Sequence, residues 1–160
     1  VFLEDCRKAW GKAVQSWVVG ADCFLTLGFF CDDSGMITSI SFTANLNGSI
    51  PHSISSLTAL TYLSFSDNNV MGSIPNGISE LSQLISLDLS NNNLTGSIPS
   101  DIRLLSDLTY LSLSNNRLTG SIPSNNIFTN PHLSYLSLSS NALTGSIPSN
   151  IQLLSQLSYL

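Results

Sequence analysis

The tetrapeptide Gly-Ser-Ile-Pro occurs five times along the chain, and this repeat constrains the fold more than any other feature. The copies lie 24, 24, 24 and 25 residues apart, beginning at Gly48, Gly72, Gly96, Gly120 and Gly145. Upstream of each copy lies the same frame of leucines and asparagine, which is clearest in LISLDLSNNNL at residues 84–94. A fixed period of this length predicts a solenoid, in which each unit buries its apolar side chains only against its neighbours.

The spacing of apolar residues within one unit predicts its local structure. The middle of the frame alternates apolar and polar residues, which favours a short strand with its leucines on one face. After the proline of four of the five copies, an isoleucine and a leucine follow three residues apart, as in Ile78 and Leu81. That spacing predicts a short helical or 3₁₀ turn with one buried side. We therefore expect five repeats of about 24 residues over residues 37–160, and the start of a sixth.

One asparagine occupies the same place in four repeats, where the chain must bend away from the strand. These residues are Asn68, Asn92, Asn116 and Asn141. A buried amide can pair with backbone groups that such a bend leaves without partners. We therefore interpret these asparagines as a structural ladder and not as ligand-binding residues.

Charge and motif content exclude several function classes. Only 9% of the residues are charged and the formal charge is −5, which argues against nucleic acid because phosphate binding needs clustered Lys and Arg. The longest apolar stretch, residues 24–30, is too short to span a membrane. The opening residues lack the pattern of a signal peptide, so we expect any leader or anchor to lie outside this chain.

No catalytic constellation is evident, and we expect neither an enzyme nor a bound cofactor or metal. Serine recurs because the repeat places it everywhere, so no serine stands out as a nucleophile. The two histidines, His52 and His132, fall in connecting segments, and we expect neither to have an aspartate at an equivalent place in the repeat. No cluster of His, Cys and Asp has the spacing of a metal site.

The frame together with LTGSIP, which is complete at Leu94, Leu118 and Leu143, resembles plant-type extracellular leucine-rich repeats. Such repeats occur in receptor-like kinases, receptor-like proteins and polygalacturonase-inhibiting proteins. The resemblance implies an α/β solenoid: a right-handed superhelix with a concave parallel sheet, convex 3₁₀ or helical segments and an extra short strand near LTGSIP. It also implies an extracytoplasmic setting, secreted or at the cell surface, and non-catalytic binding of a protein, peptide or carbohydrate.

Residues 1–36 are similar to the N-terminal cap of that family. Apolar residues between Phe2 and Trp17 recur at steps of three and four, which predicts an amphipathic helix. The resemblance implies a disulfide between Cys23 and Cys31, although Thr26 stands where the family usually has tryptophan. Cys6 is predicted to be a buried free thiol, with a bridge to Cys23 or to a missing partner as the alternative.

Two further features bear on the setting of the chain. Asn47-Gly-Ser and Asn93-Leu-Thr are sequons for N-glycosylation, which occurs in secreted proteins. The last leucines, Leu154, Leu157 and Leu160, belong to an open solenoid end without a polar cap. Since such an end exposes the core, we expect a further repeat, a cap or a partner to cover them.

The polar residues of successive strands form columns on the expected concave face. All four tyrosines share one column. Asp88 is the single charged residue in another column, where it could contact a basic or hydroxyl group of a ligand or serve only solubility. Tyrosine either stabilises the sheet through cross-strand pairs or offers an aromatic surface to a partner. The candidate ligand-binding residues are Tyr62, Asp88, Asn91, Tyr110, Asn115, Tyr135 and Tyr159.

Three functions remain open at this point. The first is a recognition module that binds a partner through the concave face, as part of a larger receptor-like or inhibitor-like protein. The second is a structural scaffold or spacer within a larger assembly, which the monotony of the repeat favours. The third is an ice- or polysaccharide-binding surface built from the regular serine columns.

Overall fold

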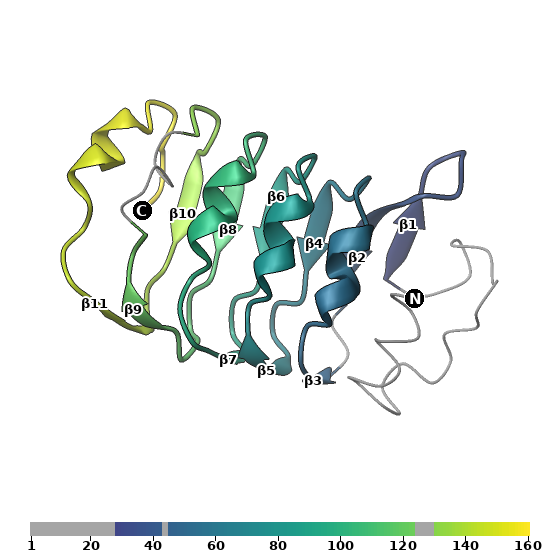
Figure 1. Cartoon of the computed structure of the whole chain (residues 1–160), viewed down its shortest axis with the longest axis horizontal. Coiled ribbons are helices and arrows are strands. Elements are labelled where there is room, and N and C mark those ends of the chain that lie inside the picture. The colour runs from purple at the N-terminus through teal and green to yellow at the C-terminus, as the bar shows by residue number, and fades with distance from the viewer. Residues whose placement is uncertain (1–27, 43–44, 124–129) are drawn as a thin grey trace.

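The computed structural model describes residues 28–42, 45–123 and 130–160 of the 160-residue chain. There the chain winds into a row of stacked coils, in which strands of a main sheet alternate with short outer strands and 3₁₀ segments (Figure 1). The predicted α/β solenoid is confirmed. The predicted cap helix and Cys6 lie outside the described residues and stay predictions.

The main sheet has six strands in the order β1-β2-β4-β6-β8-β10. β1 is antiparallel to β2, and the following strands pair in parallel because each one returns after a full coil. The register places equivalent leucines side by side, as with Leu87 and Leu111. The strands are β1 (Phe29–Cys31), β2 (Ile37–Ser41), β4 (Tyr62–Ser64), β6 (Ser86–Asp88), β8 (Tyr110–Ser112) and β10 (Tyr135–Ser137).

Short outer strands occur near LTGSIP, as the resemblance implies. They form a three-stranded and a two-stranded parallel sheet, in the orders β3-β5-β7 and β11-β9. Gly96 has a φ of 77°, a left-handed conformation that favours glycine, which explains why glycine recurs there. The outer strands are β3 (Asn47–Gly48), β5 (Asn69–Ser73), β7 (Asn93–Thr95), β9 (Thr119–Ser121) and β11 (Ala142–Thr144).

Four 3₁₀ segments in the described ranges begin directly after the proline of a Gly-Ser-Ile-Pro copy. They end before a leucine such as Leu81, and Ile78 and Leu81 are both fully buried, as their spacing predicts. The core lies between these segments and the main sheet, where Leu84, Leu87 and Leu89 have no exposed surface. The segments are η3 (His52–Ser56), η4 (Asn76–Glu80), η5 (Ser100–Leu104) and η7 (Ser149–Leu153).

Helices in the described part of the chain are all short, and none is long and apolar enough to cross a membrane.

Candidate ligand-binding site

Three of the four tyrosines stack on one another on the main sheet. The ring centroids of Tyr110 and Tyr135 are 4.3 Å apart, and the rings are 9° from parallel. Tyr135 and Tyr159 are likewise 4.3 Å apart and 5° from parallel. We call Tyr110, Tyr135 and Tyr159 the tyrosine strip. Tyr62 lies outside it, because Ser86 occupies the same column between Tyr62 and Tyr110.

Asp88 places a negative charge close to Tyr110 of the tyrosine strip. Its Oδ1 accepts hydrogen bonds from the backbone N–H of Ser90 (3.0 Å) and from the Ser90 hydroxyl (2.6 Å). Burial raises the pKa of Tyr110, and the charge of Asp88 and the neighbouring Tyr135 raise it further, whereas a hydrogen bond with Ser112 opposes the shift. Asp88 is therefore held close enough to the Tyr110 phenol to influence its ionisation.

We expect Asp88→Asn to lower the pKa of Tyr110 part of the way towards the ordinary tyrosine value, because burial remains. The raised pKa contributes stability that is fully present below the ordinary tyrosine pKa of about 10 and is lost as pH rises through the folded-state pKa. Tyrosinate absorbance during an alkaline titration measures the change. Asp67→Asn, on the exposed end of a neighbouring coil, serves as the control. A titration curve that Asp88→Asn leaves unchanged would contradict this electrostatic coupling.

Asn91 and Asn115 form a row of their own. The Asn115 amide donates to Oδ1 of Asn91 (2.7 Å), and the Asn91 amide donates to Oδ1 of Asp67 (2.8 Å). Asn91 and Asn115 have positive φ values of 55° and 54°, a conformation that asparagine and aspartate tolerate better than most residues. The structure thus brings Asp88 to the tyrosine strip and places these two asparagines in a separate exposed row.

The asparagines interpreted as a structural ladder are saturated by backbone groups. Oδ1 of Asn92 accepts the N–H of Val70 (2.9 Å), and its amide donates to the carbonyls of Phe65 (2.7 Å) and Leu89 (3.2 Å). Asn68, Asn116 and Asn141 bond to the backbone of their own and adjacent coils in the same way. Their amides are consequently not free to bind a ligand.

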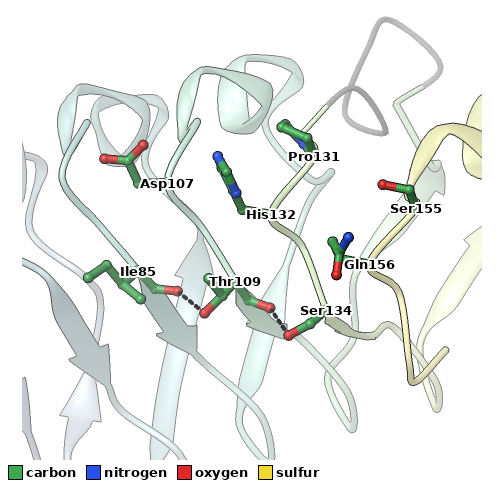
Figure 2. A pocket seen from close by; sticks show the side chains of 8 residues that line it. All are labelled: Ile85, Asp107, Thr109, Pro131, His132, Ser134, Ser155 and Gln156. Atoms are coloured by element: carbon green, nitrogen blue, oxygen red, sulfur yellow. Dashed lines mark hydrogen bonds between the residues drawn. The ribbon is translucent and has the colours of Figure 1, made fainter.

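The sequence analysis missed a pocket of about 710 Å³ at the N-terminal ends of the main-sheet strands (Figure 2). The expectation that His132 has no equivalently placed aspartate is wrong, since Asp107 occupies the same place one coil earlier and both line this pocket. The sequence signal for this pair is the position immediately before the first leucine of each repeat, where Asp107 and His132 precede Leu108 and Leu133. The pocket is lined by Ile85, Asp107, Thr109, Pro131, His132, Ser134, Ser155 and Gln156.

Hydrogen bonds shape the pocket from below and from one side. The hydroxyl of Thr109 donates to the carbonyl of Ile85 (3.2 Å), and that of Ser134 donates to the carbonyl of Thr109 (3.0 Å). Asn130, a buried residue that the sequence analysis did not single out, donates to the carbonyl of Leu105 and accepts the N–H of His132. The lining of the pocket combines apolar and polar side chains and includes no Lys or Arg.

The other predicted residues have varied surroundings. Cys31 is disulfide-bonded, but Cys6 and Cys23 lie outside the described residues, so the Cys23–Cys31 pairing stays a prediction. Of the sequon asparagines, Asn47 is exposed on β3 and Asn93 is half-buried on β7. No group of His, Cys, Asp and Glu in the described ranges could hold a metal ion.

The expected exposure of the last leucines holds only in part. Leu154 is only 5% exposed and already packs in the core, and Leu157 is partly buried against it. Leu160 is 64% exposed. Leu154 thus needs no further cover, because the last coil folds over it.

Comparison with known proteins adds independent findings. Residues 60–118 and 132–154 match two sequence patterns of the family described as Leucine Rich Repeat. A chain of the BIR3–SERK2 complex from Arabidopsis thaliana superposes with a TM-score of 0.81 and 34% identity, covering 92% of this chain and 86% of that chain. No curated protein sequence gives a significant match.

Two further solved structures are similar over nearly the whole chain. A plant ice-binding protein has a TM-score of 0.85 and 34% identity, covering 98% of this chain and 55% of that chain. The Arabidopsis receptor kinase HAESA, in complex with the peptide hormone IDA and the co-receptor SERK1, has a TM-score of 0.80 and 29% identity. That match covers all of this chain but only 26% of the HAESA structure's chain.

Proposed function

Because the chain belongs to the plant-type extracellular leucine-rich-repeat family, we propose that it is a non-catalytic recognition module that binds a protein or peptide through the tyrosine strip. Similar chains occur in a BIR3–SERK2 complex and in a HAESA complex with a peptide hormone and a co-receptor, which supports a role in ligand recognition. The same relatives support a place outside the cell or at its surface. Most of the HAESA chain has no counterpart here, so the partner must be argued from this chain's own surface.

The observation that carries the proposal is the geometry of the strip. Three rings stacked at 4.3 Å hold one another in place, so a partner that binds them restricts little side-chain freedom. Tyrosine in such a rigid setting is enriched among the residues that contribute most to binding. Because the inner ring faces are covered by their neighbours, the strip offers mainly ring edges and hydroxyls to a partner.

The surface around the strip supports the same interpretation. Thr109 and Ser134 line the pocket and directly precede Tyr110 and Tyr135. A partner lying on the strip would therefore also reach the pocket at the N-terminal ends of the same strands. Asn47 and Asn93 lie on outer strands, so glycans at these sequons would leave the main sheet uncovered. We propose that both sequons are glycosylated in the secreted protein.

The test is selection of binders from a library of random peptides displayed on phage. We expect binding peptides that lose at least about tenfold in affinity for Tyr135→Ala, because removing a central aromatic residue typically costs 2 kcal/mol or more. Met71→Ala changes an exposed residue on an outer strand and should leave affinity unchanged. A chain that selects no peptide, as expected of a passive spacer, or equal binding by Tyr135→Ala, would contradict the proposal.

Ice binding is the second candidate, because one similar structure is a plant ice-binding protein. The serine column that contains Ser64, Ser112 and Ser137 does not support it, since all three side chains are buried. The outer strands offer another regular array, in which Ser73 pairs with Thr95, Ser97 with Thr119, and Ser121 with Thr144. These six side chains are exposed, and no hydrogen bond joins their hydroxyls to another described residue.

An ice-recrystallisation assay separates the two candidates. If the chain is a recognition module, its exposed hydroxyls do not bind ice. Ice crystals should then grow in its presence as fast as they do with serum albumin, a protein that does not bind ice. Persistently small crystals that coarsen again with Thr119→Lys would support ice binding through the outer strands. Ser100→Lys, which introduces the same charge in place of an exposed hydroxyl outside that array, is the matched control.

A further inference from the structure

The column that contains the tyrosines has a gap at Ser86. The register pairs Tyr62 with Ser86 and Ser86 with Tyr110, so a small side chain stands between two aromatic ones. Neighbouring strands lie about 4.8 Å apart, which separates Tyr62 and Tyr110 by about 10 Å across Ser86. We call this space, bounded by Tyr62, Ser86 and Tyr110, the notch.

The walls of the notch are aromatic. Tyr110 stacks on Tyr135 with one ring face, so its other face lies towards Ser86. Tyr62 is 40% exposed, and no stacked ring partner accompanies it among the described residues. A separation of about 10 Å between two aromatic side chains accommodates one planar group in stacking contact with both.

An acidic side chain, that of Asp88, lies beside the notch. Ser86 and Asp88 are two residues apart on β6, so their side chains lie on the same face of the sheet. Oδ1 of Asp88 is occupied by Ser90, whereas Oδ2 makes no hydrogen bond to another described residue. Asp88 has no ion pair either, because the one salt bridge in the described part of the chain joins Arg103 and Asp101.

We propose that the notch binds an arginine side chain of the partner, with the guanidinium stacked between Tyr62 and Tyr110 and hydrogen-bonded to Asp88. Arginine fits because its planar cation stacks on aromatic faces and pairs with a carboxylate through parallel N–H donors. A lysine ammonium lacks the plane, and a neutral side chain leaves Asp88 unpaired. The chain's formal charge of −5 also favours a cationic group. The inference rests on the proposed function, since it names the chemistry by which the strip's partner is recognised.

The test is an NMR titration of the isotope-labelled chain with N-acetyl-arginine methylamide, with the lysine and citrulline analogues as comparison probes. We expect the arginine probe to shift signals of Tyr62, Ser86 and Asp88, the lysine probe to bind several-fold more weakly, and the neutral citrulline probe not to bind. Equal shifts with the citrulline probe would overturn the proposal, because its side chain has the same shape without the charge.

Ser86→Tyr provides the decisive variant, because it fills the notch with a ring and continues the stack. We expect it to abolish binding of the arginine probe. Ser39→Tyr is the matched control, since Ser39 lies in the same column on the other side of Tyr62 and leaves the notch open. If Ser86→Tyr does not fold, Asp88→Asn is used instead, and we expect it to lower the affinity for the arginine probe about tenfold. Asp67→Asn is then the control. Unchanged binding in the variant tested would overturn the proposal.

The peptide selection distinguishes failure of arginine binding in the notch from failure of ligand recognition by the tyrosine strip. Selected peptides that depend on Tyr135, contain no arginine and bind Ser86→Tyr normally would refute the notch and leave recognition by the strip intact. Selected peptides that contain arginine and lose binding in Ser86→Tyr would support both. A chain that selects no peptide refutes the function itself.

Discussion

Replacement of Asn92 by alanine is expected to lower the free energy of unfolding by about 3 kcal/mol, because each orphaned buried polar group costs roughly 1–3 kcal/mol. The N–H of Val70 is left without its acceptor, and the carbonyls of Phe65 and Leu89 each lose one of two amide donors. Each lost hydrogen bond costs about a further 1 kcal/mol. Asn92 is only 8% exposed, so water cannot replace the amide without opening the coil. The loss is shared by neighbouring coils, since Phe65 and Val70 belong to the preceding repeat.

Urea denaturation followed by circular dichroism measures this loss. Asn93→Ala is the matched control: it makes the same change one residue later, at a half-buried side chain without a hydrogen bond to another described residue. We expect the control to change stability by no more than about 0.5 kcal/mol. Equal losses in the two variants would show that the ladder is not a specific source of stability.

The architecture of the coils could be predicted because several independent patterns agree within each repeat. A two-residue alternation around Leu87 and Leu89 requires a strand, and the proline that follows stops the next segment from joining a central strand. The nearly constant interval between repeats then favours an arrangement with equivalent leucines side by side. The structure has this register at Leu87 and Leu111.

The candidate site could be predicted only as a set of columns. Alignment of the repeats put the tyrosines in one column, but ring orientation depends on neighbouring side chains and is not encoded by the repeat. Whether a hydroxyl is accessible depends in the same way on the twist of the sheet and on neighbouring side chains. Ser112, which the repeat places in a polar column, is 3% exposed, whereas Asn115 is exposed.

The pocket escaped prediction because it lies where the repeat is least regular. Asp107 and His132 precede the strands, in turns whose path is set by packing and not by alternation. The 25-residue interval falls in the same region, and there Asn130 bonds to the carbonyls of Leu105 and Leu108. The longer interval nevertheless leaves β8 and β10 in the same register as the other strands.

Two adjacent leucines test the solenoid core most directly. Leu105 is 1% exposed and packs in the core, whereas Leu104 is 47% exposed at the end of η5. We expect Leu105→Ala to lower the free energy of unfolding by about 3 kcal/mol, because truncating a buried leucine removes apolar contacts and leaves a cavity. Leu104→Ala makes the identical change at the surface and should cost less than about 1 kcal/mol.

The two leucine variants are compared by thermal and urea denaturation of the purified chain. The difference has a structural cause beyond hydrophobicity, since Leu104 is the exposed last residue of η5, whereas Leu105 follows it directly and packs in the core. The N–H of Leu105 also caps the segment by donating to the carbonyl of Ile102, and this bond survives the substitution. The expected difference therefore measures packing between coils alone. Losses of equal size would mean that the periodicity of the repeat does not decide which leucine builds the core.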